Sequence, residues 1–156
     1  MLGMGAALMR IYLDCCAYNR PYDDLSQKVM VQLEAQAKLY IQHCIRDGKY
    51  ALVTSEMLMT EVGDCPFEVR RKGIMDFIEE NSSVHVGANN NVTVDRMARE
   101  IMESGVKYKD ACHVASALLG EAEYLITTDK RLLKYQPDKI KLINPVQFVD
   151  EMEGWI

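Results

Sequence analysis

Residues 10–14 read Arg-Ile-Tyr-Leu-Asp, a short β-prone run that stops at an acidic side chain. Turn-forming residues follow at 19–24, and a helical pattern comes after them. This order of apolar run, turn and helix recurs along the chain. Further strands are expected at 50–53, 84–86, 124–126 and 140–143.

Helical spacing separates these runs. In 26–46, Val29, Leu33, Ala37 and Ile41 recur every four residues, and Asp47-Gly48 ends the pattern. Short strands joined by helices make right-handed crossovers, so the sequence predicts an α/β fold: a three-layer α/β/α sandwich with a central parallel sheet of about five short strands. The remaining helices are expected at 56–62, 66–80, 93–104, 110–119 and 145–155, with a helical turn at 130–134.

Length and composition indicate one domain. The chain has 156 residues, of which 49% are apolar and 26% charged, enough for one core. We expect residues 9–156 to form this domain and residues 1–8 to be an upstream extension of low order. The formal charge of −5 argues against binding nucleic acid through the overall field, and leaves a local basic groove open.

The cysteines and the apolar start favour a cytoplasmic protein. Five cysteines, without a Cys-x-x-Cys spacing, indicate reduced thiols and not a disulfide framework or a zinc site. Residues 1–9 lack a basic flank and are too short to span a bilayer.

Four acidic residues stand where a predicted strand meets a loop or a helix begins: Asp14, Glu61, Asp110 and Asp129. In a parallel sheet this edge is where ligands bind. Carboxylates gathered there repel one another unless a cation holds them, so the pattern predicts a hard-cation site for Mg²⁺ or Mn²⁺.

The motifs around these acids resemble the PIN domain family of metal-dependent ribonucleases, including its VapC-like members. The resemblance runs from Met9 to about Trp155, and the blocks that carry it are Ile-Tyr-Leu-Asp14-Cys-Cys, Thr54-Ser-Glu-Met-Leu-Met-Thr-Glu61-Val, Lys109-Asp-Ala-Cys-His-Val-Ala-Ser-Ala117-Leu and Leu125-Ile-Thr-Thr-Asp129. Each block alone is common, but the four in this order are specific.

The resemblance implies a catalytic and metal-binding quartet of Asp14, Glu61, Asp110 and Asp129, supported by hydrogen bonds from Thr127 or Thr128. It implies cleavage of single-stranded RNA by metal-activated water. Small stand-alone members of this kind resemble the toxin of a toxin–antitoxin pair, so a small antitoxin protein and a homodimer are expected partners.

Each acid also has a structural interpretation. Asp110 suits the first turn of a helix, Asp129 suits a turn or an N-cap, and Glu61 suits a solvated helix face. Their joint occurrence favours the metal site. Glu56 is a rival to Glu61 as the second acid.

Three further residues are candidates for substrate contact. Asn19 and Arg20 follow the first strand, although Arg20 equally suits an ion pair with Asp23 or Asp24. His113 lies three residues after Asp110, where packing beside its helix is the commoner role. Basic residues of the C-terminal third surround two of the acids, and they suit either phosphate neutralisation or a solvated face: Lys107, Lys109, Lys130, Arg131, Lys134, Lys139 and Lys141.

Two other functions remain open at this level. The first is a binding module for RNA or a protein partner that keeps the fold without turnover. The second is a phosphotransfer receiver with Asp14 as acceptor, which lacks the paired acids and the late lysine that such a site needs.

Overall fold

The computed structural model describes residues 7–23 and 28–154. Five strands form one parallel sheet in the order β3-β2-β1-β4-β5. Their bounds are β1 (Arg10–Leu13), β2 (Ala51–Ser55), β3 (Ser82–Val86), β4 (Tyr124–Ile126) and β5 (Lys141–Ile143). The predicted α/β class and the five-stranded parallel sheet are confirmed.

Helices occupy most of the remaining chain. They are α1 (Cys15–Asn19), α2 (Val29–Arg46), α3 (Glu56–Gly63), α4 (Glu68–Asn81), α5 (Asn91–Met102), α6 (Tyr108–Leu119) and α7 (Pro145–Glu153). Three short 3-10 turns join them: η2 (Arg20–Tyr22), η3 (Ala88–Asn90) and η4 (Leu132–Lys134).

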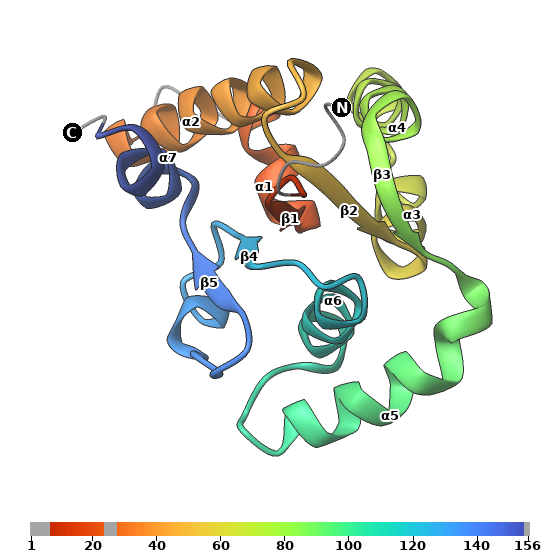
Figure 1. Cartoon of the computed structure of the whole chain (residues 1–156). Helices are drawn as coiled ribbons and strands as arrows, with labels where there is room; N and C mark the ends of the chain where they lie inside the picture. The colour runs from red at the N-terminus through yellow and green to blue at the C-terminus, as the bar shows by residue number, and fades with distance from the viewer. Residues whose placement is uncertain (1–6, 24–27, 155–156) are drawn as a thin grey trace.

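The helices cover both faces of the sheet (Figure 1). In this view α2, α7 and α4 lie above the strands, and α6 with α5 lies below them. The helices change from one face of the sheet to the other because the chain changes direction. Its crossovers first run outward from β1 to β2 and β3, and the chain then returns to β4 on the other side of β1.

One core fills the space between the layers. Apolar residues of the three central strands are completely buried, among them Ile11, Leu52 and Leu125. On α6, Ala111, Val114 and Ala115 are also fully buried, as the predicted stripe of small residues requires. The sequence thus places α6, which carries Asp110, close to the sheet.

The structure differs from the predicted elements in three places. A helix, α1, begins at Cys15 directly after β1, because the Asp14 side chain caps it; a turn was expected only from residue 19. Helix α6 begins at Tyr108, so Asp110 lies in its first turn and does not open it. The three asparagines at 89–91, expected as a loop, form part of η3 and the start of α5.

The extension predicted for residues 1–8 falls mostly outside the described residues, and the division of the chain into one domain stays a prediction. No helix in 7–23 or 28–154 is long and apolar enough to cross a membrane. All five cysteines are free in the structure.

Candidate functional site

The carboxyl end of β1 is the centre of the candidate site. Strand β1 pairs with β2 on one side and with β4 on the other, so the chain leaves it in opposite directions. Such a topological switch point opens a crevice outside the strand ends. Asp14 follows β1, Asp129 follows β4, and α3, which begins as β2 ends, carries Glu61.

Asp14 is held firmly at this point. Its side chain is 2% exposed, and its Oδ1 accepts a hydrogen bond from the Ala17 amide at 3.0 Å. Its own amide donates to the Ile126 carbonyl at 3.2 Å, which ties the end of β1 to β4. Burial raises the pKa of Asp14 to about 6 against the effect of His113 and of a hydrogen bond from Thr127, and the Asp110 charge adds to the increase.

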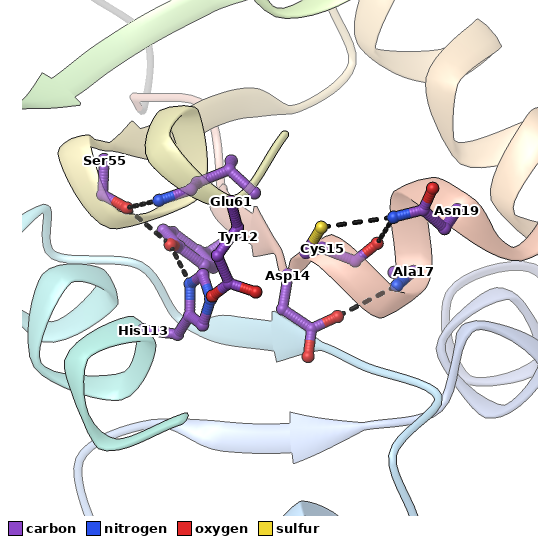
Figure 2. A network of polar contacts seen from close by, with 9 residues as sticks. Tyr12, Asp14, Cys15, Ala17, Asn19, Ser55, Glu61 and His113 are labelled. Carbon is purple, nitrogen blue, oxygen red and sulfur yellow. Dashed lines mark hydrogen bonds and ion pairs between the residues drawn. The ribbon is translucent and has the colours of Figure 1, made fainter. Parts of the chain in front are cut away.

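Glu61 and His113 form the second part of the site (Figure 2). His113 is 2% exposed, and its Nε2 lies 2.5 Å from Glu61 Oε1. Its Nδ1 lies 2.6 Å from the Tyr12 hydroxyl, which in turn lies 2.7 Å from Ser55 Oγ. Burial acts to raise the pKa of Glu61, but the hydrogen bond and charge of His113 outweigh it and lower that pKa.

Two sets of proton positions satisfy this chain of contacts. The Leu58 amide donates to Ser55 Oγ at 3.1 Å, because Ser55 is the N-cap of α3. With a neutral imidazole, the Ser55 hydroxyl donates to the Tyr12 oxygen and the Tyr12 hydroxyl donates to His113 Nδ1. With a charged imidazole, Nδ1–H donates to the Tyr12 oxygen and the Tyr12 hydroxyl donates to Ser55 Oγ. In both cases Nε2–H donates to the Glu61 carboxylate. Glu61 is thereby oriented from β1, β2 and α6 at once.

Asp110 is the least engaged acid. Within the described residues its carboxylate makes no hydrogen bond and no ion pair with another side chain. Burial raises its pKa, and the negative charge of Asp129 raises it further, followed by that of Glu61 after an opposing effect of His113. Acidic neighbours raise the pKa of Asp110 because they disfavour its ionised form, and a bound cation would stabilise that form.

Asp129 has a structural task as well as a place on the rim. Its Oδ1 accepts hydrogen bonds from the Arg131 amide at 2.9 Å and the Leu132 amide at 3.4 Å, so it stabilises the turn before η4. The turn interpretation from sequence is therefore confirmed, and Asp129 still acts electrostatically on Asp110.

The two threonines before Asp129 are buried beside it. Thr127 Oγ1 accepts a hydrogen bond from the Asp129 amide at 3.0 Å, and its hydroxyl hydrogen bonds Asp14. Thr127 thus links two of the predicted acids. Thr128 lies on the wall of a hollow with Asp129 and Glu61.

The residues that suit a metal ion are Asp14, Asp110 and Asp129, with Glu61 beside them. Oxygen donors and mutual repulsion fit a hard divalent cation. Over residues 7–23 and 28–154, however, no three or more His, Cys, Asp or Glu side chains have their donor atoms gathered as around a bound ion. The four predicted acids lie near the carboxyl end of the sheet, and the charge of Asp110 acts on Asp14 and that of Asp129 and Glu61 on Asp110. Within the described residues only Glu61 among them contacts a basic side chain, that of His113.

The three residues predicted to contact substrate lie in two different environments: Asn19 and Arg20 line a hollow, and His113 is buried. Asn19 donates to the Cys15 carbonyl at 2.9 Å, and Arg20 contacts Asp23 at 3.0 Å and Glu34 at 3.1 Å. Both line a hollow that also reaches Glu61 and Asp129. His113 is buried with both ring nitrogens bonded to protein groups, so its contact is with Glu61 and not with the open rim.

Glu56, the rival second acid, points elsewhere. It contacts His85 Nε2 at 3.0 Å on an exposed surface.

Tyr12 and Ser55 are the residues of the site that the sequence patterns did not predict. Tyr12 sits in an apolar run where burial is its expected state, and the one signal is that a buried tyrosine hydroxyl needs a polar partner.

The fold can be compared with known proteins. No protein-family model and no curated protein sequence matches the chain. Among solved structures, the chain is similar to one in a crystal structure of VapBC2 from Rickettsia felis bound to a DNA fragment from their promoter. The TM-score is 0.51 and the identity 12%, and the match covers 87% of this chain and 98% of the other. At that identity the likeness concerns the fold, and the chain has an α/β fold shared with a protein of the VapBC2 structure.

Proposed function

We propose that this chain is a metal-dependent endoribonuclease that cleaves single-stranded RNA. The observation that supports it best is the grouping of Asp14, Asp110 and Asp129 at the switch point beside β1, where burial and mutual repulsion raise the pKa of two of them. A divalent cation bound between these carboxylates would neutralise their charge and remove their mutual repulsion.

Asp14, Asp110 and Asp129 would hold Mg²⁺ or Mn²⁺, with Glu61 as the fourth acid. When bound, the ion would activate water and offset the charge of the phosphodiester in the transition state. The protein supplies the rest: Thr127 holds the Asp14 and Asp129 segments together, and His113 orients the Glu61 carboxylate, which is ionised and therefore able to accept a proton from water.

Cleavage of a labelled single-stranded RNA in Mn²⁺ tests this proposal. The wild-type protein should cleave internally, and Asp14→Asn should lose at least 100-fold in rate, on the order of the effect of removing one essential charged group from such a site. Excess chelator should abolish cleavage. Activity that survives in Asp14→Asn or in chelator would exclude this mechanism.

The biological role proposed is that of a toxin held in check by a small antitoxin protein. Support comes from the small fold and its likeness to a VapBC2 chain, nearly all of which is covered by the match. Induced expression of the chain in bacteria should arrest growth, whereas Asp14→Asn should not. If wild-type protein cleaves RNA in the test tube but leaves growth unchanged, the enzymatic proposal stands and the toxin role falls. A homodimer, the other expected assembly, is tested by light scattering after gel filtration.

One observation favours a second candidate, a binding module without turnover. The donor atoms of the described acids are not gathered for an ion, and Glu61 already has His113 as a partner. Titration calorimetry separates the two functions. The nuclease must take up Mn²⁺ at its native pH, and the inert module would not.

A further inference from the structure

A large hollow lies beside the acidic rim. Its volume is about 950 Å³, and its walls come from the turn after α5, the start of α6 and the segment that leads into η4. Asp110 and Asp129 form part of the wall, so the hollow opens directly on the candidate site. We call it the basic hollow, because four exposed cations line it: Lys107, Lys130, Arg131 and Lys134.

These four cations are not held in ion pairs, although Lys107 acts electrostatically on Asp110. Within the described chain none of their side chains makes a hydrogen bond or an ion pair, although Asp110 and Asp129 are close by. Lys49, Lys72 and Lys141, on other surfaces, each contact a carboxylate. Unpaired cations around a hollow in a chain of charge −5 are available to a polyanion.

A second hollow on the other side of Asp129 has a different character. It measures about 440 Å³, and Cys15, Glu61, Arg20 and Arg70 are among its lining residues. Both arginines are already engaged: Arg20 with Asp23 and Glu34, and Arg70 with the Tyr22 carbonyl at 2.9 Å. Arg70 has no carboxylate partner among the described residues, and Lys109 acts electrostatically on Glu61. The unpaired positive charge therefore lies mainly, and not wholly, on the side of the basic hollow.

We infer that the basic hollow is a one-sided phosphate subsite, which binds the backbone of single-stranded RNA on one flank of the cleaved phosphodiester. This inference rests on the proposed function. Phosphate is favoured over an acidic peptide because the hollow runs into the reaction centre, where a phosphodiester must lie. The strand on the other flank meets Arg20, which is already paired with Asp23 and Glu34, and Arg70, which has no carboxylate partner among the described residues, so it makes fewer ionic contacts.

The test compares two double variants of equal charge. Lys130→Gln with Lys134→Gln removes two cations of the basic hollow. Lys49→Gln with Lys139→Gln removes two cations that precede β2 and β5. They lie at the amino-terminal edge of the sheet, opposite the carboxyl-terminal edge that carries the acids. All are made in an Asp14→Asn background, so that labelled single-stranded RNA stays intact in Mn²⁺ while fluorescence anisotropy is measured over a range of KCl concentrations.

Each phosphate contact contributes about 0.7 to the salt slope of single-strand binding, which is about fivefold in affinity at 0.1 M salt. The hollow variant should therefore lose about 1.4 in slope and about 25-fold in affinity, and the edge variant should lose neither. Equal losses in the two variants would overturn the subsite. So would tighter binding of polyglutamate than of RNA, lost in the hollow variant, because the hollow would then be a protein-docking surface.

One-sidedness has its own readout. Once the cleaved bond is mapped in a long RNA, trimming nucleotides from the end that lies in the basic hollow should weaken binding more than trimming the same number from the other end. In the hollow variant this asymmetry should disappear. Equal effects of trimming both ends would overturn the inference. Wild-type cleavage, measured alongside, separates this outcome from failure of the proposed function, since an enzyme that cleaves RNA with symmetrical contacts retains the function and loses only the subsite.

Discussion

His113 connects the acid that comes from α3 to the helix that carries Asp110. Its two ring nitrogens have separate tasks: Nε2 holds Glu61 and Nδ1 holds the Tyr12 hydroxyl. A glutamine at this position places its amide near the Nε2 site, whereas an asparagine reaches only the Nδ1 site. We therefore expect His113→Gln to keep Mn²⁺ affinity within about threefold and His113→Asn to lose about 10-fold or more, in the range seen for outer-shell partners of metal ligands.

Calorimetric titration with Mn²⁺ measures both variants, and urea unfolding reports their stability. Tyr12→Phe serves as a matched variant, because it keeps the buried ring and removes only the hydroxyl that fixes the imidazole. Equal Mn²⁺ affinities for His113→Asn and His113→Gln would mean that the ring only fills space.

Asp14 makes the folded protein sensitive to pH. Its pKa of about 6 stands above the ordinary value of 3.8, so ionising it in the folded state costs free energy, and stability falls as pH rises from about 4 through about 6. The difference corresponds to about 3 kcal/mol at pH 7. Asp14→Asn keeps the N-cap of α1 and removes this cost.

Asp14→Asn should thus be more stable than wild type at pH 7, by up to about 3 kcal/mol without metal, and equal to it near pH 4. Urea unfolding at the two pH values measures this difference. A variant less stable than wild type at pH 7 would show that the buried carboxylate is stabilising as an anion. Added Mn²⁺ should raise the melting temperature of wild type only.

At the scale of the element, the cap of α3 serves both stability and the site. Ser55 Oγ accepts from the Leu58 amide and contacts the Tyr12 hydroxyl. Ser55→Ala should cost about 1–2 kcal/mol for the lost cap and hydrogen bond, and it should also weaken Mn²⁺ binding by releasing Tyr12 and His113.

The N-cap of α7 provides the control. Asn144 Oδ1 accepts from the Val146 amide at 2.8 Å, and this helix follows β5 at the edge of the sheet. Asn144→Ala should cost a similar free energy of unfolding, measured in urea, and leave Mn²⁺ affinity unchanged. If the two alanine variants bind Mn²⁺ alike, the cap of α3 has no role in the site.

Whole-molecule packing depends on the close approach of α6 to the sheet. A Cβ on Gly120 would lie 2.4 Å from Val53 Cγ1, in β2, and 3.4 Å from the Ser116 carbonyl. Gly120→Ala should therefore destabilise by about 1–3 kcal/mol through overpacking. Gly63→Ala is the matched change, because its Cβ would meet only the flexible end of Met75 at 3.7 Å, and it should be neutral or slightly stabilising. Urea unfolding of both variants checks the difference.

Much of the fold follows from local patterns in the sequence. Apolar runs and helical spacing predicted the strands and most helices, because buried parallel strands and amphipathic helices leave strong signals. Helix α1 was missed, since five residues are too few for a period to appear. Its start depended on one side chain, Asp14, acting as a cap.

The four acids could be proposed from sequence, because each stands near the end of a predicted strand or in the early part of a predicted helix. The side chains that hold these acids in place could not be predicted from sequence. Tyr12 and His113 are 101 positions apart, and nothing local pairs them. The basic hollow combines residues from 104–107 with residues from 129–136, so its shape exists only after folding. The composition therefore could not show on which side of the acids the unpaired cations gather.

The position of the site along the chain has a consequence for protein synthesis. Asp14 directly follows β1, but β4, which flanks that strand, and Asp110 and Asp129, which complete the rim, lie about 100 residues further along the chain. A ribosome-bound chain that ends before β4 has an incomplete sheet beside Asp14. The activity proposed here would then arise only once β4 and Asp129 have been translated, and a nascent chain shorter than that would leave RNA near the ribosome uncut.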